Sequence, residues 1–277
     1  RQIAESTLER MQSAGFDDSH VSVTASEQDE LNVSHNEASL LRSTENYGIS
    51  LLGILDGRRA SATLTDLSED AIGREVASLA ERVKSAPQDP ANAVSSAQSG
   101  HFEQGPLDSD LDLLADKVRE LLDYRNNQAG KVTIDEGAAS HFVSRSHEVT
   151  SQGTALSSVL GCQNLMVMCT ATEGERSSSF NYTGGSTHDL GEKHASEWFA
   201  VGDMLSETER QIDTHSFDAP FKGGVILAPG AVSDLVGWLL QQLSSGAMIA
   251  DSSVYKDSVG ERIAAPDRVR TSRRFSR

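Results

Sequence analysis

The residues of this 277-residue sequence that could do chemistry are its histidines, acidic residues and serines. The stretch SRSHEVTSQGT contains the pair His147-Glu148, which could begin a zinc-binding His-Glu-x-x-His helix. That motif needs a second imidazole at the position of Ser151, or at Gln152 for a spacing one residue longer, and neither can supply it. The surrounding residues alternate and are rich in β-branched and hydroxyl side chains, which favours a β-strand. We therefore expect no metal site at His147.

The other reactive side chains give no motif. No two of the eight histidines lie four or five residues apart, so no helix can pair them on one face. The serine-rich stretch TEGERSSSFNYTGG lacks a G-x-S-x-G elbow, and we interpret it as a hairpin or loop edge that turns at Gly174 and at Gly184-Gly185. No phosphate-binding glycine motif occurs. Cys162 and Cys169 fit two buried thiols in a reducing compartment.

Charge and hydropathy narrow the classes of partner. The formal net charge of −17 opposes nucleic acid and anionic lipid alike. The C-terminal DRVRTSRRFSR is the exception, and we interpret it as a solvated segment rather than a DNA-binding arm. No run of about 18 apolar residues occurs, so no membrane span is expected. We predict a cytoplasmic protein with neither a nucleic-acid nor a membrane partner.

Apolar periodicity predicts the elements that must position any site. A helix over 2–14 precedes β-rich segments with a hairpin at Asp56-Gly57, and a helix capped by Asp66 or Ser68 follows. A second helix runs through Leu111, Leu114, Val118 and Leu121 and leads into β-rich segments from Lys131 to about Tyr182. The next segments are predicted as a helix over 189–212, a short buried strand GGVILAP, and a helix that packs Val232, Leu235, Val236, Leu239 and Leu243 inward.

This order predicts an α+β fold with two units in tandem. We place an N-terminal α+β domain at 1–84, a linker or long loop at 85–106, and a second α+β unit at 107–217. Three of the six prolines fall in the linker. Residues 218–277 are expected to begin a C-terminal domain of which only the first part is present.

Several unusual blocks then resemble one protein family in the same order. The first is YGISLLGILDGRRASATLTDLSEDAI, and the others are SRSHEVTSQGT, ATEGERSSSFNYTGGSTHDL, GGVILAPGAVSDLVGWLLQQLSSG and ADSSVYKDSVGERIAAP. They resemble the TldD/PmbA family, whose members have been named modulators of DNA gyrase, and the resemblance covers most of residues 1–266. It implies curved antiparallel β-sheets with flanking helices, and a cytoplasmic zinc metallopeptidase assembled from two related subunits that acts on peptides.

The resemblance also implies which subunit this chain is similar to. In the catalytic subunit a helix carries His-Glu-x-x-x-His, and the corresponding positions here are Ser233, Asp234 and Trp238. These residues cannot reproduce a zinc site, because serine is a poor zinc ligand, tryptophan cannot ligate, and the aspartate has no imidazole beside it. We expect Trp238 to fill an interface instead.

The leading hypothesis is a non-catalytic, PmbA/TldE-like subunit of a TldD-type metallopeptidase complex. It carries no catalytic residue, metal or cofactor of its own, and zinc is expected in a catalytic partner. The expected partners are a TldD-like subunit or a second copy, and a peptide bound in extended form at sheet edges within 131–182. The alternatives are a homodimeric peptide-binding or chaperone-like module, and an independent hydrolase whose site is gathered from distant residues.

Overall fold

The structure is a computed structural model that describes residues 1–214, 218–220 and 222–263. The chain divides into two compact units, Arg1–His215 and Ser216–Arg277. The arginine-rich tail from Asp267 to Arg277 lies outside the described residues, so its predicted solvated state stays a prediction.

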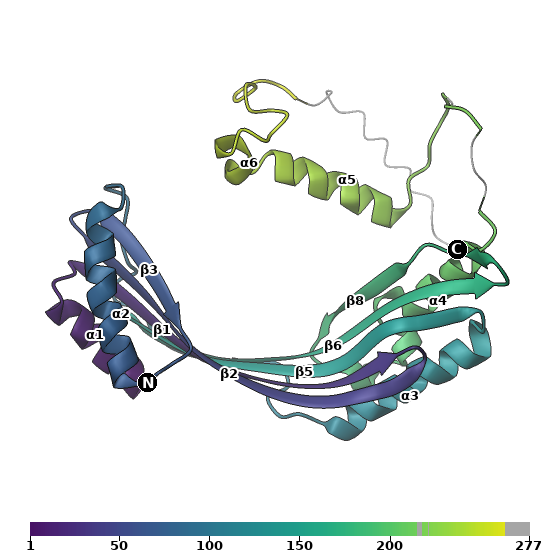
Figure 1. Ribbon diagram of the computed structural model, residues 1–277, viewed down its shortest axis with the longest axis horizontal. Helices are drawn as coiled ribbons and strands as arrows, with labels where there is room; N and C mark the ends of the chain where they lie inside the picture. Colours follow the sequence, from purple (N-terminus) through teal and green to yellow (C-terminus); the bar gives the residue numbers. More distant parts are fainter. Residues whose placement is uncertain (215–217, 221, 264–277) are drawn as a thin grey trace. The chain divides into compact units, whose positions relative to one another are not determined.

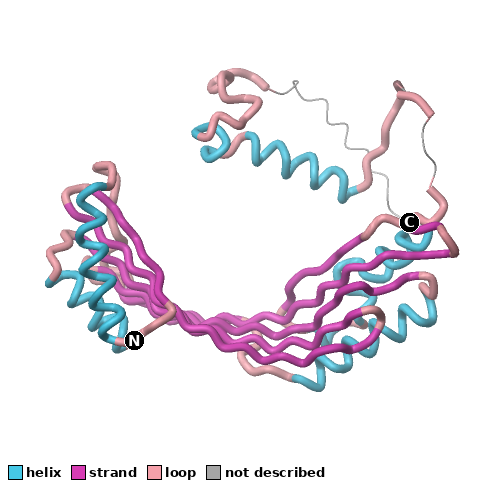
Figure 2. The backbone as a smooth tube through the Cα atoms, viewed as in Figure 1, coloured by secondary structure: helices cyan, strands magenta, loops and turns pink. Residues whose placement is uncertain are grey.

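The first unit is built on one eight-stranded sheet (Figure 1). The strand order is β3-β2-β1-β5-β6-β4, and β7 and β8 also pair with β6. Every pairing is antiparallel except that of β4 with β6. The sheet curls strongly along its long strands (Figure 2), which confirms the predicted α+β class with a curved antiparallel sheet. The strands are β1 Asp18–Ser34, β2 Glu37–Leu55, β3 Arg58–Leu64, β4 Ser99–Gln104, β5 Val132–Thr150, β6 Ala155–Glu173, β7 Arg176–Ser177 and β8 Asn181–Thr187.

The two predicted tandem segments contribute to this same sheet. Strand β1 pairs with β5 along its length, from His20 opposite Thr150 to Ser34 opposite Glu136. The segment predicted as a linker contains β4, whose partner β6 lies more than 50 residues later in the sequence, so no local pattern announces it. The hairpin at Asp56-Gly57 is confirmed, and both residues have the positive φ that a two-residue turn of this type requires.

Helices cover both ends of one face of the sheet. Helix α1 (Gln2–Ser13) and α2 (Glu69–Arg82) pack on one end, and α3 (Leu111–Gln128) and α4 (Val201–Arg210) pack on the other. Ser68 caps α2 by accepting a hydrogen bond from the Ala71 amide, as one of the two predicted caps. Val21 and Val33 of β1 are buried in the two different helix layers, and residues an even number apart share a face. The opposite face is therefore free of helices within residues 1–214, and we call it the open face.

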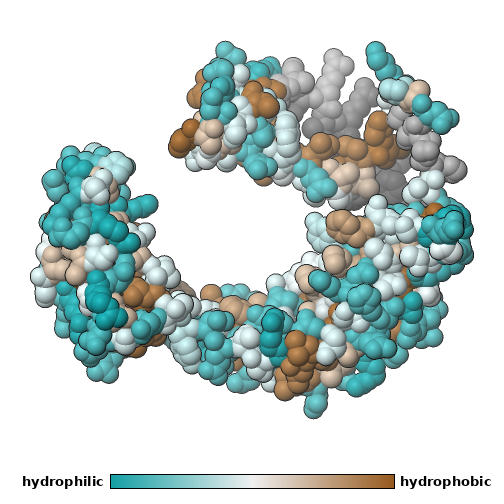
Figure 3. Space-filling model, in the orientation of Figure 1, coloured by the Kyte–Doolittle hydropathy of each residue, from teal (hydrophilic) through white to brown (hydrophobic). Residues whose placement is uncertain are grey.

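The core of the first unit forms two clusters on the helix-covered face. One contains the predicted stripe Ile72, Val76, Leu79 and Val83 of the α2 region, packed against β1 and β2. The other contains Leu114, Val118 and Leu121 of α3 and the predicted row Trp198, Val201, Leu205 and Ile212. Hydrophilic residues predominate on the outer surface over the helices in the view of Figure 3.

The single helix predicted over 189–212 is wrong. The structure has two 3₁₀ turns, Leu190–Glu192 and Ala195–Ala200, before α4 begins at Val201. The Trp198 indole donates a hydrogen bond to the Leu190 carbonyl, and Phe199 has a φ of 51°, so the backbone leaves the helical path there. The Thr183 hydroxyl of β8 donates a hydrogen bond to the Phe199 carbonyl, so contacts with the Leu190 turn and with the sheet override the helical periodicity of this segment.

The second unit contains α5 (Pro229–Gln242) and the short α6 (Ser245–Ile249). The buried strand predicted for GGVILAP is wrong, because the described part of this segment forms no strand and its apolar side chains are exposed, Ile226 to 99%. The prediction that α5 packs its apolar side chains inward is also wrong in the described structure, where Val232, Leu235 and Val236 are exposed. Within the described residues, no helix is long and apolar enough to cross a membrane.

Candidate functional site

His147 and Glu148 lie in strand β5, as the alternation of the sequence predicts. Neighbouring residues of a strand point to opposite faces, so the two side chains cannot share a ligand. Glu148 Oε2 lies 3.4 Å from His20 Nε2 on the open face. His147 lies on the covered face beneath α1, where burial lowers the pKa of its imidazole and Nε2 has no hydrogen-bond partner.

The three positions that correspond to the family's zinc motif lie on α5. Ser233 and Trp238 are separated by about 140° around a regular α-helix, so they point in different directions. Ser233 and Asp234 are exposed, and the Trp238 side chain is 48% exposed. Among the residues that the structure describes, no three histidine, cysteine, aspartate or glutamate side chains come together as a metal site would require. The expected interface of Trp238 stays a prediction.

The open face is lined by small polar side chains on its central strands. Every open-face position of β1 is polar, and hydroxyl residues also recur on the neighbouring strand β5. Glu30 is 9% exposed and accepts hydrogen bonds from Gln28, Asn32 and Arg42. The side chains at the centre of this face therefore satisfy part of their hydrogen-bonding capacity with one another. The polar open-face residues of the two strands include His20, Ser22, Thr24, Ser26, Gln28, Glu30, Asn32, Ser140, Ser144, Ser146, Glu148 and Thr150.

The character of the open face changes to apolar toward β6 and β8. Leu160 and Met166 of β6 are 45% and 48% exposed, and Tyr182 of β8 is 73% exposed. A cavity of about 340 Å³ lies on these two strands and is lined by Asn164, Leu165, Met166, Tyr182, Thr183, Gly184, Gly185 and Ser186. Its rim is fixed by the hydrogen bond that the Ser186 hydroxyl donates to Asn164 Oδ1 at 2.6 Å.

Two glycines allow this part of the sheet to form. A Cβ on Gly184 would lie 2.7 Å from the Leu165 carbonyl oxygen, so only glycine lets β8 approach β6 so closely. A Cβ on Gly185 would lie 2.6 Å from the Phe199 ring, which packs on the covered face of β8. The prediction that Gly184-Gly185 forms a turn is therefore wrong, whereas Gly174 does lie in a turn with a φ of 62°.

A sheet can bind an extended peptide by strand addition only at an edge whose main-chain groups are unpaired. Strands β5 and β6, which fill most of the predicted region 131–182, are unsuitable, because β5 lies between β1 and β6, and β4, β8 and β7 pair along most of the outer side of β6. Strand β8 (Asn181–Thr187) pairs only with β6 in the described residues, so its other edge is open. The predicted location of a bound peptide within 131–182 stays a prediction, and the open edge of β8 lies at the end of this region and just beyond it.

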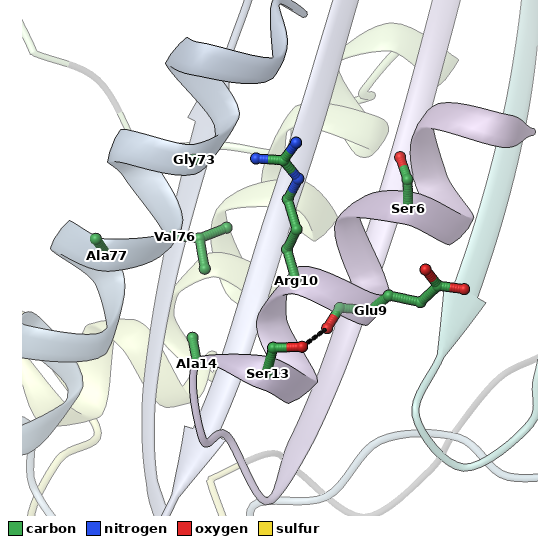
Figure 4. Close-up of a pocket in the computed structure, with 8 residues that line it drawn as sticks. All are labelled: Ser6, Glu9, Arg10, Ser13, Ala14, Gly73, Val76 and Ala77. Atoms are coloured by element: carbon green, nitrogen blue, oxygen red, sulfur yellow. Dashed lines mark hydrogen bonds between the residues drawn. The ribbon is translucent and has the colours of Figure 1, made fainter.

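A separate cavity of about 450 Å³ lies between α1 and α2 (Figure 4). Arg10 extends across it toward α2, donates a hydrogen bond to the Glu69 carboxylate at 2.9 Å, and lies close to Gly73, where a Cβ would be 3.2 Å from Nη1. No group in this cavity is arranged for acid-base or nucleophilic chemistry. We interpret it as a gap between two helices joined by an ion pair.

No family model and no curated protein matches this sequence. Solved structures do match its fold, and the three described below have low sequence identity. TldE from Thermococcus kodakarensis is 16% identical with a TM-score of 0.58, and the match covers 76% of this chain and 47% of that one. A putative modulator of DNA gyrase from Bacteroides thetaiotaomicron is 15% identical with a TM-score of 0.70, covering 95% of this chain and 61% of that one.

A third match is a putative modulator of DNA gyrase from Thermotoga maritima, 10% identical with a TM-score of 0.52, covering 75% of this chain and 47% of that one. The chain spans about half to three fifths of the length of these three proteins. The curled sheet, its flanking helices and these likenesses together show that the chain has the fold of TldE and the putative modulators of DNA gyrase.

Proposed function

We propose that this chain is a non-catalytic subunit of a TldD-type zinc metallopeptidase complex and that it holds a peptide in extended form at β8. The observation that carries the proposal is the open edge of β8 beside an apolar cavity, on a fold shared with TldE. An extended peptide that adds to this edge would satisfy its own main-chain groups and place alternate side chains toward Met166 and Tyr182.

The division of roles follows from the side chains on α5. Ser233, Asp234 and Trp238 cannot provide the two imidazoles and the general base of a zinc peptidase, so cleavage is assigned to a zinc-bearing partner subunit. This chain contributes binding and orientation of the peptide. Its two free cysteines agree with the cytoplasmic location that we propose for the complex.

A peptidase assay with and without a zinc-bearing homologue from the same cell, together with a metal count, tests this proposal. We expect the purified chain to hold no stoichiometric zinc and to cleave no peptide alone, and to increase peptide cleavage when the homologue is added. Stoichiometric zinc together with unaided cleavage would contradict it and favour the independent hydrolase.

The alternative is a homodimeric peptide-binding or chaperone-like module without protease activity. The β8 edge and its cavity favour it equally, because both lie within this chain and need no partner to bind a peptide. An inactive chain that binds peptides but neither co-purifies with the homologue nor stimulates it would support this alternative over the leading proposal.

A further inference from the structure

Strand β2 has a long edge without a partner in the described residues. On one side it pairs with β1, whereas on the other side β3 pairs only with Ile49–Leu55. At the far end of the edge, the register between β1 and β2 shifts at Asn32/Val33, which marks a β-bulge opposite Ser39. The regular, open stretch is therefore Leu40–Gly48, which forms the lower border of the sheet in Figure 1.

This stretch lacks the usual protection of an edge strand. It contains no proline and no lysine, and Leu40, Leu41 and Tyr47 are each slightly more than half exposed. Its one cation is directed inward, since Arg42 Nη2 lies 2.5 Å from Glu30 Oε1. A long, regular edge of this kind is a template for pairing with another strand.

We propose that Leu40–Gly48 pairs with the same stretch of a second copy, antiparallel about a two-fold axis at Thr44. This proposal is independent of the proposed function, because it involves neither β8 nor α5. Two copies related by a two-fold axis perpendicular to the sheet keep their open faces on the same side. Residue 40 can therefore lie opposite only even-numbered residues of the partner strand.

The side chains that would lie opposite each other disfavour the neighbouring registers. An axis at Arg42 would place arginine opposite arginine, and an axis at Glu45 would place glutamate opposite glutamate; like charges directly opposite each other are destabilising. An axis at Ser43 would place the exposed Leu41 opposite Glu45. None of these registers pairs the exposed apolar residues with each other.

The register centred on Thr44 pairs the exposed apolar residues with each other and places no like charges opposite each other. It places Leu41 opposite Tyr47 of the second copy and Tyr47 opposite its Leu41, two aromatic–aliphatic pairs of the kind that stabilises antiparallel sheets. At each end of the paired stretch, Leu40 of one copy lies opposite Gly48 of the other. The pairing ends there because the β-bulge precedes Leu40 in one copy and β3 begins to pair with β2 after Gly48 in the other. The paired length thus equals the regular open stretch.

Cysteine cross-linking tests this register directly. In a Cys162→Ser background, with Cys169 fully buried, Thr44→Cys should form a disulfide-linked dimer under mild oxidation by oxygen with copper phenanthroline. Ser43→Cys and Glu45→Cys should each cross-link weakly alone but efficiently when the two variants are mixed, because these positions lie opposite each other across the axis.

Sedimentation equilibrium measures the association without cross-linking. The full chain should dimerise, and more strongly as salt rises from about 0.1 M to 1 M, because salt screens the repulsion between two copies of charge −17. Leu41→Lys and Tyr47→Lys should weaken the dimer at least tenfold. Leu160→Lys, on an exposed apolar residue of β6, is the matched control and should leave the dimer unchanged.

Three results would overturn the proposal. They are a chain that stays monomeric at all salt concentrations, equal cross-linking at positions 43, 44 and 45, and dimers that both edge variants leave unchanged. Circular dichroism of Leu41→Lys and Tyr47→Lys separates loss of the dimer from loss of the fold. Cross-linking of Thr44→Cys only to a zinc-bearing homologue would also contradict pairing with a second copy.

Discussion

At the residue scale, Gly184 fixes the distance between the two strands that line the candidate peptide site. The position cannot hold a β-carbon without moving the main chain of β6. Glycine in the interior of a strand weakens the strand, so its presence here points to close approach of another backbone rather than to flexibility. Sequence alone predicts a turn at Gly184-Gly185, because it cannot distinguish a glycine that forms a turn from one that allows close approach of another backbone.

We predict that Gly184→Ala destabilises the fold by about 1–3 kcal/mol, because its Cβ would meet the Leu165 carbonyl oxygen at 2.7 Å. Urea unfolding followed by circular dichroism measures the change. Gly130→Ala is the matched control, since no atom lies within 4 Å of a Cβ built there. Equal effects of the two substitutions would contradict the close-approach explanation.

His147 adds a pH-dependent contribution to stability. Burial lowers the pKa of its imidazole, so over a window below about 6.5 the unfolded chain binds a proton that the folded chain does not. The contribution is fully present above about pH 6.5 and is lost as the pH falls through that window toward the folded pKa.

The wild type should therefore lose more stability between about pH 7.5 and pH 5.5 than His147→Gln does. Unfolding curves at both pH values give the change in the free energy of unfolding for each protein. The difference between these two changes isolates the contribution of His147, because the carboxylates are the same in both proteins. His101→Gln, at an exposed position of β4, controls for the loss of an imidazole. Parallel pH profiles of the wild type and His147→Gln would exclude the effect.

At the element scale, β8 gives the sheet one open edge with an apolar side. If a peptide adds to this edge, its contacts with Met166 and Tyr182 should supply part of the affinity, because both side chains are exposed in the free protein and would be covered on binding. The polar centre of the open face would contribute much less.

We predict that Tyr182→Ala and Met166→Ala each weaken binding of an apolar, extended peptide about tenfold, equivalent to ~1.4 kcal/mol. Fluorescence anisotropy with a labelled peptide measures the dissociation constant without a partner subunit. Phe102→Ala is the control, because this exposed aromatic residue belongs to β4. A loss of affinity in the control alone would place the peptide on the edge of β4 instead.

The elements that could be predicted from the sequence are those that depend on residues close together in the chain. Helices α1 and α2, the Ser68 cap and the Asp56-Gly57 hairpin depend on residues within a few positions of one another, and the structure confirms them. Strand β4 depends on β6, a partner more than 50 residues away, and the 3₁₀ turns before α4 depend on tertiary contacts such as that of Thr183 in β8 with Phe199. The cavity at β8 was missed for the same reason, since it requires the register of β8 on β6.

At the scale of the whole first unit, one sheet carries two separate hydrophobic clusters. The long strands β1 and β5 run through both clusters, with Val21 and Val149 in one and Val33 and Ala139 in the other. The strands therefore connect the two ends of the unit by continuous main-chain hydrogen bonding, which favours a single cooperative unfolding transition.

We predict that Leu79→Ala in one cluster and Leu165→Ala in the other shift the same transition, each by about 2–5 kcal/mol. In a Trp238→Phe background, far-ultraviolet circular dichroism and the fluorescence of Trp198, which lies in the Leu165 cluster, should report coincident unfolding curves in both variants. A Leu79→Ala protein that loses structure while the Trp198 signal stays native would show that the two ends unfold independently.

The pairing of β1 with β5 also dictates the order in which this chain can fold as it is synthesised. The β1–β2 hairpin closes through a short turn soon after residue 55, but the partner of β1 on its other side is more than 100 residues further along. Until β5 has been made, the β1 edge of the early hairpin is exposed to other nascent chains. Joining the two hairpins closes a large loop, so this step should limit the folding rate, and the interval before it is when the chain most needs a chaperone.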